Sequence, residues 1–530
     1  MVFRAMNSLR SCDTVRPNTM RSATTQARTR TLCPSSGMAL AQLTPFKPKL
    51  PRALLRRPPF NALPQTKDTR DAVPFHSPVN VIPMMPSRAL SSKASCVAVV
   101  GLSARMLAQS AARAGLNVIA LDIFGDRDTR EHAGLWFNIG GREPAIDRAR
   151  LFAALEHVAR LPGVLGFIVT SGLEPLADEL YRAEHLPRFI GNSMEATAVV
   201  RDPRRFFSLL DEVGIRHPEV RFSCPADTAG WLVKHADGCG GLHIKLAGTA
   251  FATSNASNAH RPSPAFAASK ASAAVRSAAP SPCAPAAAFH TTIPTEATHL
   301  TASPAYFQRL CPGRSMSALF VAAEREARVI GFAEQLSFAA ETLPFVHAGS
   351  IGPIDLPADI AGRIGDAIRT VVRRTGLTGL NSIDFLLDGD TFHVLEINTR
   401  PSSTMTLYET TWPDAWPRGL IGCHLDACLN GQLPLAPPVA PFCRAAQRVV
   451  FARHGFTVSD RFSDACSSDP VCHDVPLPGT RIETNQPVCT LIVTAPTVTG
   501  VHQELERQHT LLLKRIETLH KPCYNVRSRL

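Results

Sequence analysis

The sequence predicts a chain of mixed α/β and α+β structure, and three observations lead to this fold class. A β-α-β unit begins at Cys96, where two apolar strands flank a helix with apolar periodicity. A hairpin of two apolar strands spans Asn381 to Thr404, and short strands separated by turns follow from Ala440 to Thr499. Parallel strands joined by helices, followed by antiparallel hairpins, indicate an α/β unit and then α+β units.

The first predicted domain covers residues 94–198 and is Rossmann-like. The segment from Cys96 to Phe124 has a strand, a tight turn, a helix and a second strand that ends at Asp122. The turn, GLSAR, matches neither GxGxxG nor GxSxG, so it indicates neither a dinucleotide site nor a nucleophile elbow. We therefore interpret Ser103 as a helix N-cap.

Loops at the carboxyl ends of parallel strands bind ligands in α/β folds. Glu174 follows the predicted strand of residues 166–170, and Arg105 follows the first strand, so both are candidate substrate contacts. The alternatives are a helix-capping acid for Glu174 and a surface arginine for Arg105.

The predicted hairpin carries the most informative functional pattern. Side chains alternate along a strand, so Glu396, Asn398 and Arg400 share one face, and a turn of three to five residues centred on Asp390 would bring Asp384 opposite Glu396. Two carboxylates, an amide and a guanidinium suit a Mg²⁺ ion with its phosphate ligands. An ordinary hairpin with a solvated polar face is the other interpretation, and the residues alone leave both open.

These residues resemble the metal-binding signature of ATP-grasp enzymes, in which an acid on one strand is followed twelve residues later by Glu-x-Asn-x-Arg. The resemblance implies that Asp384, Glu396 and Asn398 bind Mg²⁺ (or Mn²⁺) and that Arg400 is catalytic. It also implies ATP as the nucleotide.

The segment WLVKHADGCGGLHIK, from Trp231 to Lys245, is similar to the strand, glycine-rich loop and second strand of the same family. Glycines let backbone N–H groups approach a phosphate closely, and a lysine adds a point charge. Taken alone, such a loop is more often an ordinary Gly-rich turn between two strands. Downstream, residues 306–322 resemble the hinge strand that contacts adenine. The implied nucleotide-binding residues are Lys234, Gly238, Gly240, Gly241, Lys245 and Gln308.

The chain departs from biotin-carboxylase-like members at Pro203, where they carry an early lysine for the α-phosphate. Arg201, Arg204 and Arg205 are the candidate substitutes, although a guanidinium differs in geometry from an ammonium group. The segment from His347 to Pro357 is similar to a loop that precedes the helix leading into the metal hairpin.

The resemblance implies a Rossmann-like pre-ATP-grasp domain (94–198), a two-lobed ATP-grasp fold (199–430) and a small β-rich C-terminal region (431–530). That last region is similar to the barrel-like tail of biotin carboxylases, and we expect a terminal amphipathic helix over Gln503 to Leu519.

The implied activity is that of an ATP-dependent carboxylate-amine (or carboxylate-thiol) ligase that forms an acyl phosphate and releases ADP and phosphate. Its partners would be a small-molecule carboxylate and an amine, and a homodimer is expected by analogy. The segments from Tyr306 to Pro357 are similar to those of carboxylase-related ATP-grasp proteins, a subgroup linked to tetrahydromethanopterin-type one-carbon cofactor biosynthesis. The alternatives are a carboxyphosphate-forming, carboxylase-like enzyme and a non-catalytic ATP-binding regulatory protein.

Charge and composition bound the remaining possibilities. Residues 1–93 contain 15 Lys or Arg and three acids, so the whole net charge of +12 lies there, and the rest of the chain has 41 residues of each sign. The balanced charge of residues 94–530 argues against a basic nucleic-acid-binding surface in that part of the chain. The segment 1–93 is predicted to be a disordered basic extension, either a targeting segment or an unstructured start. Residues 250–303, rich in Ala, Ser, Pro and Thr, are predicted to be a disordered insertion.

The 14 cysteines are scattered and form no CxxC pair. Cys423, His424 and Cys428 lie close in sequence, as do Cys466, Cys472 and His473, but neither group has zinc-knuckle spacing. Reduced cysteines in a cytoplasmic protein are the favoured interpretation. No apolar run reaches the roughly 18 residues of a membrane span, so no membrane association is expected.

Overall fold

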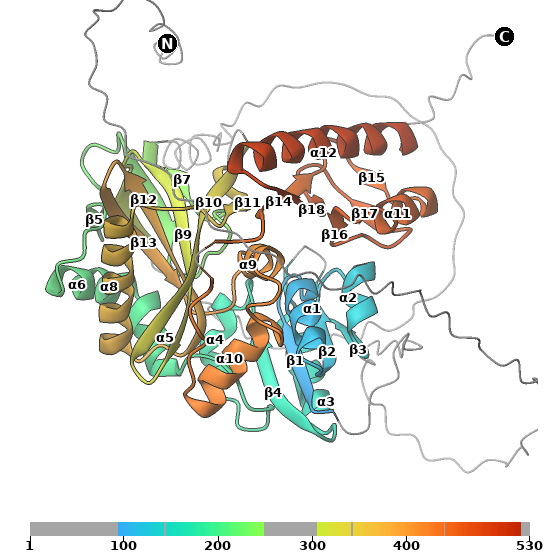
Figure 1. Ribbon diagram of the computed structural model, residues 1–530, viewed down its shortest axis with the longest axis horizontal. Coiled ribbons are helices and arrows are strands. Elements are labelled where there is room, and N and C mark those ends of the chain that lie inside the picture. The colour runs from blue at the N-terminus through green and yellow to red at the C-terminus, as the bar shows by residue number, and fades with distance from the viewer. Residues whose placement is uncertain (1–93, 142–144, 249–304, 341–342, 439, 521–530) are drawn as a thin grey trace, which may run out of the picture. The chain divides into compact units, whose positions relative to one another are not determined.

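The computed structural model describes residues 94–141, 145–248, 305–340, 343–438 and 440–520 (Figure 1). All of them fall within one unit of the chain, Phe75–Leu530. The predicted basic extension and the predicted insertion lie outside the described residues.

The first domain is a parallel sheet whose strands alternate with helices along the chain. Its elements are β1 (Cys96–Val100), α1 (Arg105–Arg113), β2 (Asn117–Asp122), α2 (Arg127–His132), β3 (Leu135–Asn138), α3 (Arg148–Ala159), β4 (Val164–Val169), η1 (Glu174–Leu176) and α4 (Ala177–Arg182). The strand order is β3-β2-β1-β4, with every pair parallel. Apolar side chains on both faces of β1 are buried, as a sheet covered on both sides requires. The predicted Rossmann-like start is confirmed.

The turn after β1 differs from the prediction for Ser103. Helix α1 begins after Ala104 without a side-chain cap, and the Ser103 hydroxyl instead donates to Asp474 Oδ1 at 3.0 Å. The Ala104 N–H donates to Oδ2 of the buried Asp122 at 3.0 Å. The other Asp122 oxygen accepts two further N–H groups, so this carboxylate at the end of β2 is engaged within its own domain.

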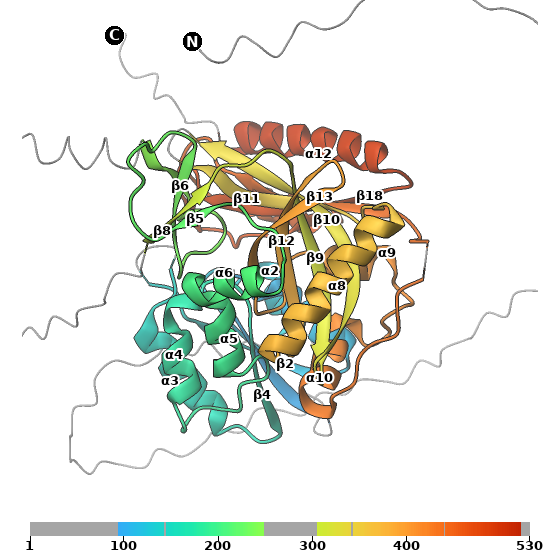
Figure 2. The ribbon, with the colours of Figure 1, turned by 90° about the vertical axis from the view of Figure 1, so that its left-hand side faces the viewer.

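An eight-stranded antiparallel sheet forms the centre of the described structure (Figure 2). Its strands are β9 (Arg314–Ala323), β10 (Glu326–Ala340), β11 (Leu343–Gly352), β12 (Gly379–Asp388), β13 (Thr391–Asn398), β14 (Arg444–Phe451), β16 (Cys472–His473) and β18 (Pro487–Ala495). The order is β13-β12-β9-β10-β11-β14-β18-β16. Helix α8 (Ala358–Thr375) contributes buried apolar side chains to the same core as β9 and β12.

Two predictions for this part of the chain were wrong. Residues His347 to Gly352 belong to strand β11 and not to a loop, because β11 pairs with β10 on one side and β14 on the other. The strands of the C-terminal region do not form a separate barrel-like tail, because β14, β16 and β18 extend the central sheet. Outside that sheet, the region contains β15 (Phe456–Thr457), β17 (Arg481–Ile482), α11 (Asp460–Ser467) and α12 (Val498–Leu519). The last of these confirms the predicted terminal helix.

A small four-stranded sheet carries the glycine-rich loop. Its strands, in the order β5-β8-β6-β7, are β5 (Val220–Arg221), β8 (Ala305–Arg309), β6 (Trp231–His235) and β7 (Lys245–Leu246). One face forms a core of its own with Trp231, Val233 and Phe307. Because side chains alternate, Lys234 and Gln308 lie on the opposite face.

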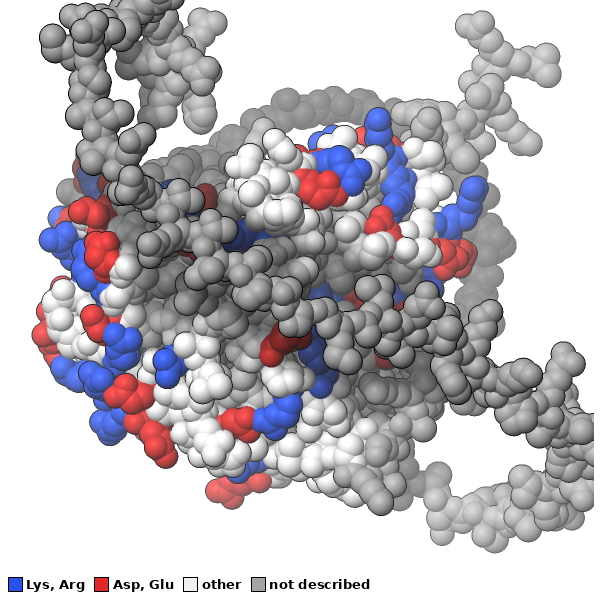
Figure 3. Space-filling model, in the orientation of Figure 1, with Lys and Arg blue, Asp and Glu red and all other residues white. Residues whose placement is uncertain are grey.

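The remaining helices flank these sheets: α5 (Met194–Arg201), α6 (Pro203–Glu212), α9 (Met405–Thr411) and α10 (Gly419–Asn430). On the face shown in Figure 3, acidic and basic side chains are interspersed over the described surface. None of the helices described is long and apolar enough to cross a membrane.

Candidate active site

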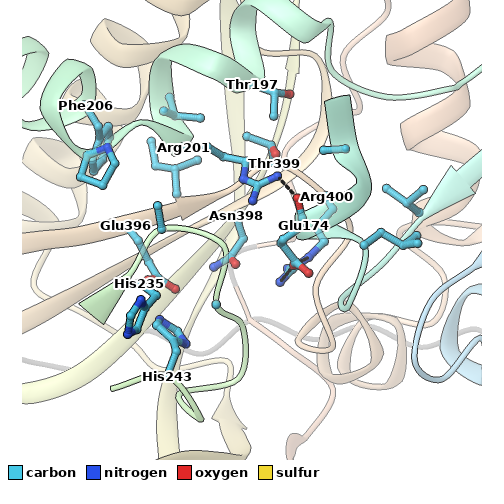
Figure 4. Close-up of a pocket in the computed structure, with 18 of the residues that line it drawn as sticks. Glu174, Thr197, Arg201, Phe206, His235, His243, Glu396, Asn398, Thr399 and Arg400 are labelled. Atoms are coloured by element: carbon cyan, nitrogen blue, oxygen red, sulfur yellow. Dashed lines mark hydrogen bonds and ion pairs between the residues drawn. The ribbon is translucent and has the colours of Figure 1, made fainter. Parts of the chain in front are cut away.

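A pocket lies where the end of β13 meets the small sheet, helices α5 and α6 and the first domain (Figure 4). Charged, polar and apolar side chains from these elements line it. Those labelled in Figure 4 are Glu174, Thr197, Arg201, Phe206, His235, His243, Glu396, Asn398, Thr399 and Arg400.

The hairpin of β12 and β13 pairs Asp384 with Glu396, as predicted from the sequence. The route to this register differs from the prediction. The turn holds only Gly389 and Asp390, and the register shifts by one residue between Asp384 and Phe385. A β-bulge adds a residue to one strand and re-aims the side chains beyond it. The bulge therefore brings Glu396 opposite Asp384.

Asp384 is held in a network of polar side chains. Asn398 Nδ2 donates to Asp384 Oδ2 at 3.2 Å, and Ser317 and Gln335 also hydrogen-bond to this carboxylate. Burial raises the pKa of Asp384 to about 6, and the nearby Glu396 carboxylate adds to the rise. The Glu396 carboxylate disfavours the ionised form of Asp384, and a cation bound by both carboxylates would offset this repulsion.

Lys234 lies within electrostatic range of both carboxylates. Its side chain is 3% exposed, and burial lowers its pKa, which Glu396 and Asp384 act to raise. Among the described residues, its ammonium group has no hydrogen-bond or ion-pair partner at close range. A buried ammonium without a direct partner is costly, so this position is suited to an anionic ligand.

The glycine-rich loop between β6 and β7 is docked on strand β11. The His347 N–H donates to the Gly240 carbonyl at 2.9 Å. Gly241 has a φ of +77°, and a Cβ there would lie 1.9 Å from the Phe345 carbonyl oxygen. A Cβ on Gly238 would lie 1.9 Å from the His243 ring. Glycine is thus required at two positions for close approach.

We expect Gly241→Ala to undock this loop, because its Cβ would meet backbone that does not move easily. Amide hydrogen exchange at His347 and across residues 236–244 should become about fivefold faster, since the docking hydrogen bond contributes about 1 kcal/mol. Gly240→Ala is the matched control: its φ is also positive, at +64°, but no atom lies within 4 Å of the added Cβ. Equal exchange in the two variants would contradict the docking argument.

Two further predicted nucleotide contacts lie on the small sheet. Gln308 on β8 is 1% exposed, and its Nε2 has no hydrogen-bond partner among the described residues. A buried unpaired donor indicates a missing acceptor. Lys245 begins β7 and is exposed, so its side chain is free to move.

Arg400 is joined to the first domain by Glu174. Arg400 Nε and Nη2 both bind Glu174 Oε1, at 2.9 and 2.7 Å, while Glu174 Oε2 accepts the Gly172 N–H at 2.7 Å. Burial would raise the pKa of Glu174, but Arg400, a backbone hydrogen bond and Arg201 together outweigh it and lower the pKa. Glu174 therefore lines the pocket and positions Arg400, a contact that neither sequence interpretation of Glu174 included.

Of the three candidate substitutes for the early lysine, only Arg201 lines the pocket. Its Nη1 donates to the Glu174 carbonyl at 2.7 Å, and its Nη2 binds Asp237 of the glycine-rich loop at 2.9 Å. Arg204 is exposed and lies over the Phe222 ring. Pro203 occupies the first turn of α6, a position where proline needs no N–H partner.

Arg105 is not brought to this pocket. It lies on α1 with 5% of its side chain exposed, which also rules out the surface arginine expected as the alternative. Its Nε binds Asp474 Oδ1 at 2.8 Å, and Asp128 lies 3.6 Å away. Arg105 thus links the first domain to the C-terminal region.

His243 and His347 were not singled out from the sequence. His243 lines the pocket, and its buried Nδ1 has no partner among the described residues. Burial lowers the pKa of His347 to about 4, and Arg400 adds to this. His243 lies within the glycine-rich segment and His347 within strand β11, and a single histidine in either segment forms no pattern that would have marked it.

The described residues contain no group of three or more His, Cys, Asp or Glu side chains that could hold a metal ion by themselves. His424 accepts the Leu380 N–H at 2.9 Å, a structural contact. Asp384, Glu396 and Asn398 are a different kind of donor set, two carboxylates with an amide, which suits an ion that takes further oxygens from a bound phosphate.

The Rossmann-like domain is followed by the small and the central antiparallel sheets, and the pocket lies where the end of β13 meets the small sheet. Residues 257–404 match the family model of the ATP-grasp domain, and this chain accordingly contains an ATP-grasp domain. No curated protein sequence matches the chain.

Solved structures with this fold are distant in sequence. Biotin carboxylase from Campylobacter jejuni is 12% identical, with a TM-score of 0.53 over 77% of this chain and 90% of its own. L-amino acid ligase from Bacillus licheniformis is 11% identical, with a TM-score of 0.53 over 80% and 98%. Carboxyaminoimidazole ribonucleotide synthase from Aspergillus clavatus, complexed with ATP, is 15% identical, with a TM-score of 0.53 over 80% and 99%. These similarities establish the ATP-grasp fold.

Proposed function

We propose that this chain is an ATP-dependent, Mg²⁺-requiring ligase that joins a small-molecule carboxylate to an amine, or to a thiol, through an acyl phosphate. The observation that carries the proposal is the pairing of Asp384 with Glu396 at a pocket that also contains Arg400, with the buried Lys234 in electrostatic range. The ATP-grasp domain match and the ATP complex of one neighbour support ATP as the nucleotide.

The residues fit a hard divalent ion. Asp384, Glu396 and the amide oxygen of Asn398 would hold Mg²⁺ (or Mn²⁺), which would offset negative charge on the transferring phosphoryl group. Lys234 and the N–H groups of Gly240 and Gly241 would bind phosphate oxygens, whereas the Gly238 N–H donates to the His235 carbonyl at 3.2 Å and Gly238 would shape the loop. The unpaired Gln308 amide would face the base, and Lys245 would add charge from the edge of the small sheet.

In the proposed reaction, a substrate carboxylate oxygen attacks the γ-phosphorus of ATP. The bond to ADP breaks and an acyl phosphate forms, with Arg400 stabilising charge on the transferred group. The amine nitrogen then attacks the acyl carbon, loses a proton and expels phosphate. The glycine-rich loop, docked on β11, would keep water from hydrolysing the intermediate.

Bicarbonate is the second candidate carboxylate, which would give a carboxyphosphate-forming enzyme. A biotin carboxylase among the structural neighbours favours this variant. Both variants use the same ATP chemistry and differ in the acceptor. The narrower link to one-carbon cofactor biosynthesis and the homodimer are further proposals, and light scattering of the purified chain would test the latter.

Phosphate release from Mg-ATP tests the proposal. The purified chain is screened against pools of carboxylates and amines, including bicarbonate and acids related to one-carbon carriers. We expect one carboxylate-amine pair to stimulate release at least about tenfold, and chelation of the metal to abolish it. Tight Mg-ATP binding without stimulation by any pool would contradict a ligase and favour a non-catalytic ATP-binding protein.

A further inference from the structure

One end of the pocket lies against the first domain and α5, and most of the lining side chains there are apolar or aromatic. We call it the apolar end, and its lining residues are Leu173, Ala177, Leu180, Tyr181, Phe189 and Val200. Leu173, Leu180 and Val200 are 3%, 6% and 5% exposed. These side chains therefore form a desolvated wall and not an open surface.

The polar atoms near this wall are already paired. The Tyr181 hydroxyl donates to the Asn192 carbonyl at 3.1 Å and lies 2.9 Å from Thr197 Oγ1. The Thr170 hydroxyl donates to the Pro401 carbonyl at 3.4 Å. Of the two arginines in the described pocket lining, Arg201 is bound to the Glu174 carbonyl and to Asp237, and Arg400 is bound to Glu174 through Nε and Nη2. A phosphate or a polyhydroxylated group would lose its water here without gaining partners.

Aromatic packing fixes the wall in place. The Phe189 ring contacts the Tyr181 ring edge-on at 5.0 Å and the Phe167 ring at 5.3 Å between centroids. Edge-to-face pairs of this kind hold ring orientation. The apolar end is thus preformed, which favours binding of a ligand that needs no rearrangement.

The Arg400 guanidinium is the group in this pocket that suits a carboxylate, and Arg400 follows strand β13 of the hairpin. Glu174 takes Nε and Nη2 of Arg400, and Nη1 has no hydrogen-bond partner among the described residues. Arg400 is one of the pocket-lining residues, so this edge of the guanidinium can reach a ligand. A carboxylate there would lie next to Asn398, on the same strand as Glu396.

We infer that the carboxylate substrate carries a bulky apolar or aromatic side chain, which binds at the apolar end while its carboxylate binds Arg400 Nη1. This inference rests on the proposed function, because it names the substrate class of that reaction. It disfavours phosphate-bearing acceptors such as ribonucleotides, for which the apolar end has no donors.

Calorimetric binding of small acids to the full chain tests the inference. The probes are 3-phenylpropionate, acetate and 3-phosphoglycerate. We expect 3-phenylpropionate to bind at least about tenfold tighter than either of the others, since a phenyl ring buries apolar surface there. Ala177→Leu should weaken 3-phenylpropionate binding at least about tenfold by filling the apolar end. Ala183→Leu, outside the pocket lining, is the control and should bind it like the wild type.

Tighter binding of 3-phosphoglycerate, or an Ala177→Leu variant that melts like the wild type and binds 3-phenylpropionate equally well, would overturn the inference. Mg-ATP affinity and phosphate release on the same samples separate the two proposals. Phosphate release stimulated only by phosphorylated acids would refute the inferred apolar substrate and leave the proposed ligase function standing. Selective 3-phenylpropionate binding without ATP turnover for any amine would support the apolar end and refute the ligase.

Discussion

Replacing Glu396 by glutamine is expected to lower metal-dependent ATP turnover by at least about 10²–10³-fold, because it weakens binding of the metal ion that would offset transition-state charge. Asp384→Asn should have a similar effect, because the two carboxylates face each other across the hairpin. The measurement is the phosphate-release rate as a function of Mg²⁺ concentration.

The folded state should survive these changes. Both substitutions preserve size, and they remove negative charge from a pair in which burial and the Glu396 carboxylate already raise the pKa of Asp384 to about 6. We therefore expect melting temperatures at or above that of the wild type. Asp388→Asn is the matched control, since Asp388 is exposed at the outer end of the same strand and should leave turnover unchanged. Full activity in Glu396→Gln would remove Glu396 from the metal site.

The pairing of Asp384 with Glu396 shows how sequence patterns predict local geometry. Alternation along two strands placed the two acids on one face, and the structure agrees. The assumed turn was longer than the observed Gly389–Asp390 turn, and the bulge near Glu396 restored the register. A bulge depends on packing with neighbouring strands, so the hairpin sequence alone did not reveal it.

Contacts between distant segments account for what the sequence left unpredicted. Strand β14 pairs with β11, about a hundred residues earlier in the chain, and this pairing turns an expected separate barrel into a continuation of the central sheet. Glu174 and Arg400 are 226 residues apart, yet they share an ion pair in the pocket. Strand and helix periodicity carries no information on such partners, because it reports only which face is buried.

Arg105 also makes a contact that the sequence did not predict, because its partner Asp474 lies 369 residues away. The carboxylates of Asp126 and Asp128 lie in the same cluster. Burial, followed by the Asp474 charge, raises the pKa of Asp128 to about 6 and raises that of Asp126 well above its usual value. Burial would raise the pKa of Asp474 too, but Arg105 together with hydrogen bonds from Thr490 and Ser103 outweighs it and lowers the pKa. One buried cation thus balances several acids between the first domain and the C-terminal region.

Arg105→Met is accordingly expected to destabilise the fold by about 3–5 kcal/mol near neutral pH, because it leaves buried carboxylates without their cation. Arg373→Met is the control. Arg373 pairs with Glu326 at the surface, where both side chains are more than half exposed, so its loss should cost at most about 1 kcal/mol. Unfolding of both variants is followed by thermal and chemical denaturation.

The pH dependence of this loss has a definite sign. Where the native pKa of an aspartate exceeds its unfolded value, the native state binds more protons between the two values, so stability falls as pH rises through that window. Without Arg105 the native pKa of Asp128 rises further and Arg105 no longer lowers that of Asp474, so protonation of both aspartates relieves the unpaired charge in acid. The loss caused by Arg105→Met should therefore be smaller near pH 5 than near pH 7.5, whereas the Arg373→Met loss should stay nearly constant. A loss that grows toward acid, or one no larger than that of Arg373→Met, would show that Arg105 does not neutralise this cluster.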